Sequence, residues 1–113
     1  MNIEEAKKIT LSLISTFDKA GHSALALREA GLKKEIKSDK TPVSNGDIEV
    51  NKILTDKISE ITPSIPIVSE ENSAYKNEKN LNNFWLIDPI DGTREYIGNR
   101  DEFTLNAALI INK

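Results

Sequence analysis

Apolar residues recur at three- and four-residue steps over two long stretches, which predicts two amphipathic helices. The first stretch covers residues 3 to about 30, and its apolar stripe is Ile3, Ala6, Ile9, Leu13, Phe17, Ala20, Ala24 and Leu27. Gly21 weakens this helix by roughly 1 kcal/mol relative to Ala, which allows a bend or break there. Gly31 and the two lysines at positions 33 and 34 mark its C-terminal end.

The second helix is predicted to begin after Ser44, behind a polar loop or hairpin over residues 36–43. Ser44 and Asp47 have the spacing of a capping box, with Asp in place of the longer Glu. The buried stripe of this helix is Val50, Leu54, Ile58 and Ile61. The helix is expected to end at Thr62, because the residue before a proline is pushed out of the helical region.

Three apolar runs in the second half of the chain predict strands. They cover residues 66–69, 84–87 and 103–111. The second run is predicted to be buried and to stop at Pro89, which fixes φ and lacks a backbone N–H. The third run is mostly apolar and is therefore expected in the interior of a sheet. Between the first two strands, residues 72–83 are polar and Asn-rich, which predicts a mobile loop.

Acidic residues follow the first two predicted strands. They are Glu70, Glu71, Asp88 and Asp91. Neighbouring strands lie about 4.8 Å apart, so these carboxylates meet at one edge of the sheet if the two strands pair. Gly92 and Thr93 then open a short helical segment, residues 94–97, whose N-terminal amides favour an anion. The alternative is ordinary turn chemistry, in which an Asp binds nearby backbone amides.

Composition narrows the class of protein. A chain of 113 residues with 38% hydrophobic and 29% charged residues suits one soluble globular domain. A net charge of −3 argues against a general binder of nucleic acid or acidic membranes. The polar, acidic start is not a signal peptide, and no run approaches the roughly 18 apolar residues of a membrane span. A cytoplasmic location is expected, and peripheral attachment at the inner face of the cell membrane stays open.

The available ligands restrict the metal chemistry. The chain has no cysteine, and its one histidine, His22, is interpreted as a surface or packing residue. Clustered carboxylates repel one another unless cations neutralise them, and an all-oxygen ligand set selects Mg²⁺ or Mn²⁺ over zinc. Two such ions about 3.5–4 Å apart can bridge a phosphoryl group and activate a water. The pattern therefore indicates metal-assisted hydrolysis of a phosphomonoester, with no covalent protein intermediate.

Several separated motifs resemble one family. The run Asp-Pro-Ile-Asp-Gly-Thr over residues 88–93 is similar to the signature of the inositol monophosphatase superfamily of Mg²⁺-dependent, lithium-sensitive phosphatases. Segments 41–47, 62–71, 94–97 and 102–106 resemble the CysQ-type 3'(2'),5'-bisphosphate nucleotidases within that superfamily. Inositol phosphatases typically continue differently after the Gly-Thr pair and rank second. The resemblance covers essentially the whole chain.

The resemblance implies a fold and a set of metal ligands. The fold is of the α/β class, with two long N-terminal helices packed on a mainly antiparallel sheet. The first metal is expected on Glu70, Asp88 and the backbone carbonyl of Ile90. Asp88 is expected to bridge to a second metal that Asp91 also holds, and the complete enzyme is expected to bind two or three Mg²⁺ ions.

The resemblance also implies catalytic and substrate-binding residues. Thr93, with Glu70, is expected to orient the attacking water, and Asp47 to lie near a third, weaker metal through water. The expected substrate-binding residues are Glu70, Asp91, Gly92 and Thr93. Asp47 is equally a candidate helix cap, and the two roles are compatible. Lys37 and Lys40 are candidates for phosphate contact, with solvated loop lysines as the alternative.

The expected reaction converts the small nucleotide 3'-phosphoadenosine 5'-phosphate to AMP and phosphate, in sulfur assimilation. The alternatives are an inositol-1-monophosphatase-type phosphatase and a truncated, non-catalytic remnant that binds a metal or a partner. Members of the superfamily are longer than this chain, so residues 1–113 are expected to form the N-terminal, metal-binding half of a phosphatase domain. The absent half would supply a further Asp for the second metal and most of the substrate pocket. The oligomeric state stays open.

Overall fold

A computed structural model describes residues 1–69 and 82–112. Its elements in chain order are α1 (Ile3–Leu11), α2 (Ile14–Ala30), β1 (Lys34–Ile36), β2 (Pro42–Ser44), α3 (Asn45–Ile61), β3 (Ile67–Ser69), β4 (Phe84–Asp91), α4 (Thr93–Ile97) and β5 (Thr104–Ile110). Glu70, Glu71 and residues 72–81 of the predicted mobile loop lie outside the described residues.

The first predicted helix is interrupted, although not at Gly21. α2 runs through Gly21, and the break lies at Ser12 and Leu13, between α1 and α2. The Ser12 hydroxyl donates to the carbonyl of Ile9 at 2.6 Å and closes the last turn of α1. Leu13 is buried in the core, whereas α1 buries none of its residues. The break therefore separates a helix that is only partly covered, with Ile9 against the core, from one that contributes fully buried residues.

The second helix, α3, follows the sequence prediction at both ends. Ser44 is its N-cap and forms a complete capping box with Asp47, and Thr62 is its C-cap. Both interactions satisfy backbone groups that a helix end leaves without partners. No helix in the described part of the chain is long and apolar enough to cross a membrane.

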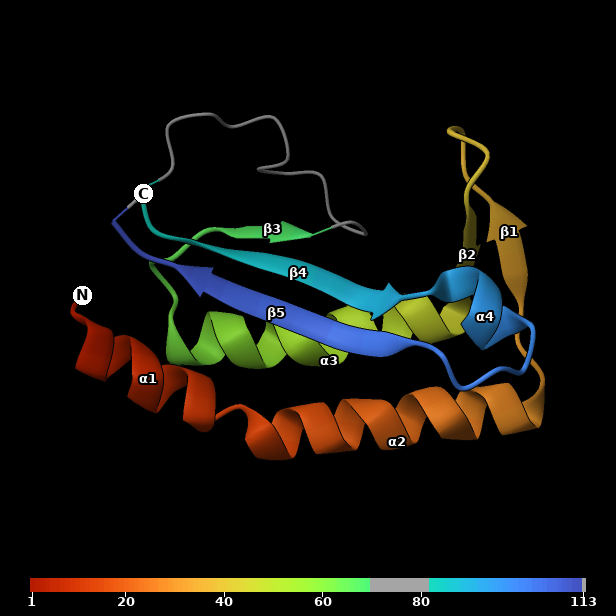
Figure 1. Cartoon of the computed structure of the whole chain (residues 1–113), viewed down its shortest axis with the longest axis horizontal. Coiled ribbons are helices and arrows are strands. Elements are labelled where there is room, and N and C mark those ends of the chain that lie inside the picture. Colours follow the sequence, from red (N-terminus) through yellow and green to blue (C-terminus); the bar gives the residue numbers. More distant parts are fainter. Residues whose placement is uncertain (70–81, 113) are drawn as a thin grey trace.

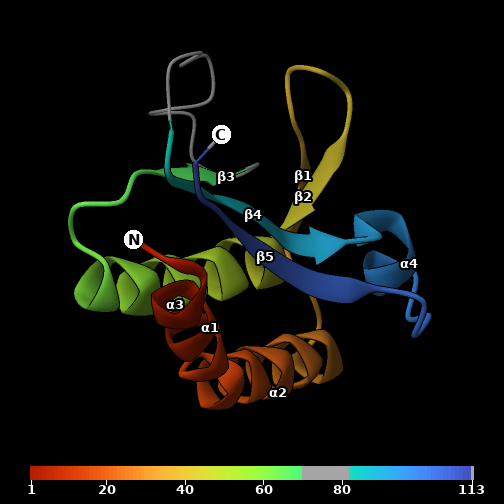
Figure 2. The same ribbon diagram turned by 60° about the vertical axis from the view of Figure 1, so that its left-hand side comes forward.

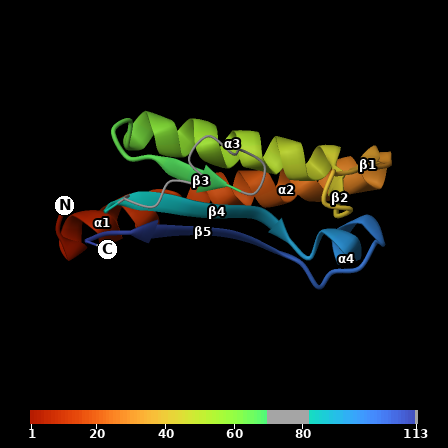
Figure 3. The same ribbon diagram turned by 90° about the horizontal axis from the view of Figure 1, so that it is seen from above.

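Two small sheets complete the fold. β3, β4 and β5 form a three-stranded sheet in that order, with β3 parallel and β5 antiparallel to β4. β1 and β2 form the antiparallel hairpin that residues 36–43 suggested. Figures 1 and 3 show α2 and α3 side by side on one face of the three-stranded sheet. The arrangement is a layered α/β fold with a mainly antiparallel strand set, as the sequence predicted.

Three strand predictions need correction. β4 is only half-buried, because alternate residues face away from the helices and the Leu86 side chain is 50% exposed. β4 also continues past Pro89 to Asp91. A one-residue shift in register between Asp88 and Asp91 leaves Pro89 without a partner residue on β5, and a bulge of this kind accepts a residue that lacks an N–H. β5 has one neighbour among the described strands and is an edge strand there, not an interior one.

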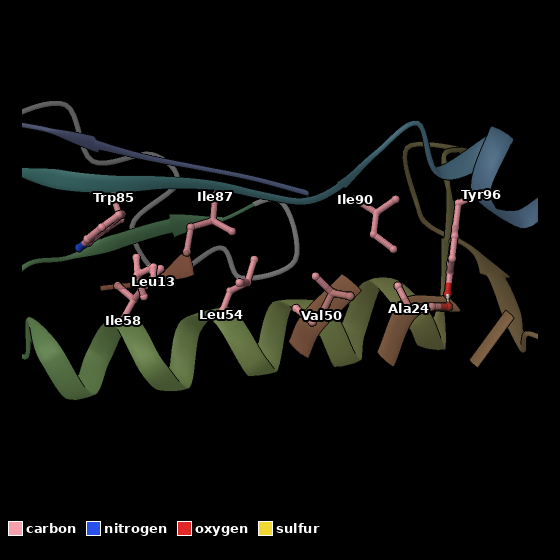
Figure 4. Packing of buried hydrophobic residues seen from close by; sticks show 10 residues of the cluster. Leu13, Ala24, Val50, Leu54, Ile58, Trp85, Ile87, Ile90 and Tyr96 are labelled. Carbon is pink, nitrogen blue, oxygen red and sulfur yellow. Dashed lines mark hydrogen bonds between the residues drawn. The ribbon is translucent and has the colours of Figure 1, made fainter. Parts of the chain in front are cut away.

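The core lies between β4 and the two helices beneath it. Figure 4 shows the row of buried side chains on α3, Val50, Leu54 and Ile58, directly opposite those of β4. Trp85 fills one end of this core, where its indole N–H donates to the Thr62 hydroxyl at 3.0 Å. Tyr96 fills the other end. The apolar stripes of α2 and α3 thus pack against one face of the sheet and place the start of α3 beside the end of β4, whereas Ile3, at the start of the first predicted stripe, is 75% exposed.

Candidate active site at the end of the sheet

The two strands that precede the predicted carboxylate ligands are direct neighbours. Ser69, the last residue of β3, pairs with Ile87, which precedes Asp88 on β4. The parallel pairing brings the C-terminal ends of both strands to the same end of the sheet, as the sequence argument required. Glu70 itself lies outside the described residues, so its predicted role stays a prediction.

A cavity of about 330 Å³ lies beyond the end of β4. Its walls come from β4 and α4 on one side and from the β1–β2 hairpin on the other, and Figure 2 shows the hairpin standing beside α4. The lining residues are Lys37, Asp39, Thr41, Pro42, Asp88, Ile90, Asp91, Gly92, Thr93, Arg94 and Glu95. The structure therefore gathers five predicted site residues, at positions 88 and 90–93, around one open space.

Asp47 reaches this region from the first turn of α3 and is almost fully buried. One carboxylate oxygen, Oδ2, accepts hydrogen bonds from the Ser44 amide at 2.8 Å and the Ser44 hydroxyl at 2.6 Å. The other oxygen, Oδ1, accepts from the Thr93 hydroxyl at 2.8 Å. The cap role of Asp47 is confirmed. Its predicted place near a third metal stays a prediction, and both of its oxygens already have protein partners.

Thr93 has one hydroxyl proton and two acceptors within reach. Its Oγ1 lies 2.8 Å from Asp47 Oδ1 and 3.2 Å from the backbone carbonyl oxygen of Ile90. A hydroxyl has one proton and two acceptor lone pairs, so a proton directed to Asp47 leaves Oγ1 able to accept from a water. The hydrogen bond between Thr93 and Asp47 was not part of the sequence prediction, which paired Thr93 with Glu70.

Gly92 turns the chain from β4 into α4. It is the N-cap of α4 and has a left-handed backbone with φ of 94°. A Cβ at this position would lie 2.8 Å from the backbone oxygen of Glu102, so the position excludes a side chain in space as well as in conformation. The turn places Asp91 before α4 and Thr93 at its first residue, on the wall of the same cavity.

Tyr96 lies on α4 and is fully buried. Its hydroxyl donates to the backbone carbonyl of Ala24 at 2.6 Å. Burial raises the pKa of the Tyr96 phenol above its ordinary value, the Asp47 carboxylate raises it further, and Arg28 acts in the opposite direction. The phenol is therefore a protonated donor at neutral pH. The sequence analysis did not single out Tyr96, because a single aromatic residue in a short helical segment gives no periodic signal.

The candidate metal-ligating atoms at the cavity are oxygen atoms. Asp88 and Asp91 line it together with Ile90, whose backbone carbonyl is a further candidate ligand. No group of three Asp, Glu or His side chains placed to hold a metal occurs within residues 1–69 and 82–112. The donor chemistry fits a hard divalent cation, and the two described carboxylates form part of such a ligand set.

The fold and this site define a layered α/β protein with a carboxylate-lined cavity at the end of its sheet. The chain belongs to the inositol monophosphatase family, whose model matches residues 5–113. It is 41% identical over 95 residues to the 3'(2'),5'-bisphosphate nucleotidase CysQ of Buchnera aphidicola, which covers 80% of this chain and 36% of that protein. It is 40% identical over 78 residues to CysQ of Haemophilus influenzae, which covers 67% of this chain and 29% of that protein.

Solved structures agree with this assignment. The structure of CysQ from Bacteroides thetaiotaomicron matches with a TM-score of 0.72 and 28% identity, over 98% of this chain and 40% of that one. The IMPase TM1415 of Thermotoga maritima matches with a TM-score of 0.77 and 25% identity, over 94% of this chain and 40% of that one. The chain thus spans well under half the length of the relatives that it matches.

The β1–β2 hairpin carries two lysines whose roles the sequence left open. Lys37 and Lys40 were both open to interpretation as solvated loop residues. Lys37 is half-buried and lines the cavity, whereas Lys40 is exposed and does not line it. The signal that separates them is the hairpin itself, because only its folded register shows which positions face α4.

Proposed function

We propose that this chain supplies the metal-binding part of an Mg²⁺-dependent phosphomonoesterase of the 3'(2'),5'-bisphosphate nucleotidase type. The single observation that carries the proposal is the hydrogen bond from Thr93 to the buried Asp47, at the wall of a cavity that Asp88 and Asp91 also line. Because the chain covers only part of its relatives' length, the activity is proposed for a protein that contains it.

The proposed metal ligands are Glu70, Asp88, Asp91 and the backbone carbonyl of Ile90. A divalent cation bound there supplies charge for a phosphoryl group and makes a bound water more acidic. Asp88 and Asp91 are two like charges at one cavity, and a cation between them removes their repulsion. Gly92 and Thr93 are proposed to hold the phosphate through their backbone amides at the start of α4.

Thr93 and Asp47 are proposed to orient the attacking water together with Glu70. The Thr93 hydroxyl donates to Asp47, and its free lone pair then accepts from the water. The water oxygen forms a bond to phosphorus while the bond from phosphorus to the ester oxygen breaks. The water gives up a proton to solvent and the leaving oxygen takes one up from solvent, so that the ester and one water give the alcohol and inorganic phosphate. Asp47 fixes the Thr93 hydroxyl in the accepting orientation throughout.

The proposed substrate is 3'-phosphoadenosine 5'-phosphate, which loses its 3'-phosphate to give AMP. Two relatives that are 40% and 41% identical to this chain over the aligned 78 and 95 residues are named as bisphosphate nucleotidases, which supports this choice. The match to the Thermotoga IMPase supports inositol 1-phosphate as the second candidate. A role in sulfur assimilation and a cytoplasmic location stay predictions.

The test uses the chain itself and a chimera in which it replaces the matched segment of Buchnera aphidicola CysQ. Phosphate release is measured from both candidate substrates, with Mg²⁺ and with the metal removed by a chelator. Mn²⁺ binding to the isolated chain is measured by electron paramagnetic resonance. Asp88→Asn is expected to lower phosphate release by the chimera at least about 100-fold and to weaken Mn²⁺ binding by the chain.

Asp56→Asn is the matched control, because it makes the same charge change at an exposed position on α3. It is expected to leave both measurements unchanged. Full activity in the Asp88→Asn chimera would show that Asp88 is not a metal ligand. Faster release from inositol 1-phosphate than from the nucleotide would replace the proposed substrate with the second candidate.

A further inference from the structure

We infer that Tyr96 is a positioning residue, which sets the distance between the first turn of α3 and the start of α4 and so maintains the hydrogen bond from Thr93 to Asp47. The inference rests on the proposed function, in which this hydrogen bond orients the attacking water. It adds a residue that is not among those lining the cavity.

Two contacts between α3 and α4 run side by side. Asp47 on α3 accepts a hydrogen bond from Thr93, the first residue of α4. The residue before Asp47 is Gly46, and it faces Tyr96, three residues beyond Thr93. A displacement of the α4 backbone relative to the first turn of α3 therefore changes both separations, because both pairs lie on the same two short stretches of backbone.

The contact between Gly46 and Tyr96 is close and leaves no room for a side chain at position 46. A Cβ on Gly46 would lie 2.2 Å from the Tyr96 hydroxyl oxygen and 2.6 and 2.7 Å from two ring carbons. The ring is fully buried, and its hydroxyl is fixed by the hydrogen bond to the Ala24 carbonyl on α2. Tyr96 thus spans the space from α4 across the first turn of α3 to α2, as the right-hand end of Figure 4 shows for Tyr96 and Ala24.

Arg28 and Phe103 hold the other side of the ring. The Arg28 guanidinium carbon lies 5.6 Å from the Tyr96 ring centroid and 5.2 Å from that of Phe103, and the two rings meet edge to face at 4.9 Å. Arg28 also donates to the carbonyl oxygen of Arg100 at 2.7 Å and to the Asp101 carboxylate at 2.8 Å. These contacts tie the segment after α4 to α2.

The ring is therefore enclosed by α2, by the first turn of α3 and by Phe103, and the hydroxyl is the only hydrogen-bonding group of the Tyr96 side chain. Tyr96→Phe removes the hydrogen bond to the Ala24 carbonyl but keeps the ring. A displacement of under 1 Å at the reacting groups is enough to lower a catalytic rate strongly. Tyr96→Phe is accordingly expected to act on the Thr93–Asp47 pair and not on substrate contacts.

The first measurement needs no activity. The ¹³C chemical shift of the Asp47 side-chain carboxyl is recorded by NMR in the 113-residue chain and its variants. Thr93→Val removes the hydrogen bond and defines the direction of the shift. Tyr96→Phe is expected to move the resonance in that direction by less. Thr62→Val, which also removes a buried hydroxyl but at the far end of the core, is expected to leave it unmoved.

Two results of this measurement would overturn the inference. The Asp47 resonance could stay at its wild-type position in Tyr96→Phe while it moves in Thr93→Val. It could also move equally in Thr62→Val, which would reveal a general loss of packing. If Tyr96→Phe does not fold, Arg28→Lys decides, because it keeps the Tyr96 hydroxyl and the charge but lacks the planar guanidinium. It must then shift the same resonance in the same direction.

The second measurement is a double-mutant cycle in the chimera. Tyr96→Phe is expected to lower kcat about ten-fold with little change in KM. In the Thr93→Val background the same change is expected to have no further effect on kcat, because the group that it positions is gone. A kcat loss of equal size in both backgrounds overturns the inference. A wild-type chimera that releases no phosphate overturns the proposed function instead, and the Asp47 resonance alone then decides the role of Tyr96.

Discussion

The two ends of the core differ in what their polar groups do. At the Trp85 end, the Thr62 hydroxyl accepts from the indole N–H and donates to the carbonyl of Ile58, so both of these donors have partners inside the protein. At the Tyr96 end, the Asp47 carboxylate accepts three hydrogen bonds, and the Thr93 hydroxyl has two acceptors for one proton. The first end is closed, whereas the second borders a cavity.

The backbone shows the same contrast. Around Trp85, β4 pairs regularly with both neighbours. Toward Tyr96, the strand is bulged between Asp88 and Asp91, and Gly92 is left-handed. Irregular backbone costs stability and is tolerated where it places functional groups. The comparison predicts that the regular end provides most of the stability, whereas the proposed chemistry lies at the irregular end. The following predictions test this division.

The largest expected effect is at the regular part of the core. Leu54 is fully buried between α3 and β4, so Leu54→Ala removes packing and leaves a cavity. The free energy of unfolding, measured by urea denaturation of the chain, is expected to fall by about 2–5 kcal/mol. The Mn²⁺ affinity of the folded Leu54→Ala chain is expected to equal that of the wild-type chain.

Leu25→Ala is the matched control, because Leu25 is half exposed on α2. Its effect on the free energy of unfolding is expected to stay within about 0.5 kcal/mol. A loss of Mn²⁺ affinity in folded Leu54→Ala would remove the proposed division between the two ends of the core.

A smaller effect is expected at Gly92. In Gly92→Ala the new Cβ meets the Glu102 backbone oxygen in a conformation that L-residues disfavour. The free energy of unfolding is expected to fall by about 1–3 kcal/mol, and here Mn²⁺ affinity should fall as well. The control is Gly21→Ala inside α2, where a Cβ meets nothing within 4 Å. The same substitution there is expected to raise stability by about 0.5–1 kcal/mol. Equal effects at both glycines would contradict the role given to the left-handed turn.

The regular parts of the fold were predictable from sequence because their signals are periodic. The capping box of α3 and its end at Thr62 appeared as predicted, and so did the buried stripe except for Ile61, which is only partly buried. The strand before Asp88 was also predicted, as was the short helix after Gly92. In each case neighbouring residues carry the information, so hydrophobic spacing and cap chemistry suffice.

The failures lie where tertiary contacts decide. The break lies at Ser12 and Leu13, where no glycine or proline marks it, whereas helix propensity pointed to Gly21. The continuation of β4 past Pro89 depends on a bulge opposite β5. The link between Asp47 and Thr93 joins residues 46 positions apart. Such contacts leave no local pattern, so the site residues could be named from a motif while their connections could not.

The smallest expected effect separates two lysines of the β1–β2 hairpin. Lys37 lines the cavity, as does Arg94, whereas Lys40 lies three residues further on and is not among the lining residues. If the hairpin belongs to the chemical end of the molecule, Lys37→Ala should raise KM for the phosphorylated substrate in the chimera by up to about five-fold, since an ion pair in a solvated site contributes at most about 1 kcal/mol. Lys40→Ala removes the same charge and should leave KM unchanged. The contrast should shrink at high salt, because screening weakens the interaction of Lys37 with an anion. Equal effects of the two substitutions would mean that only the net charge of the hairpin matters, and the wall that it forms would then not contact the substrate.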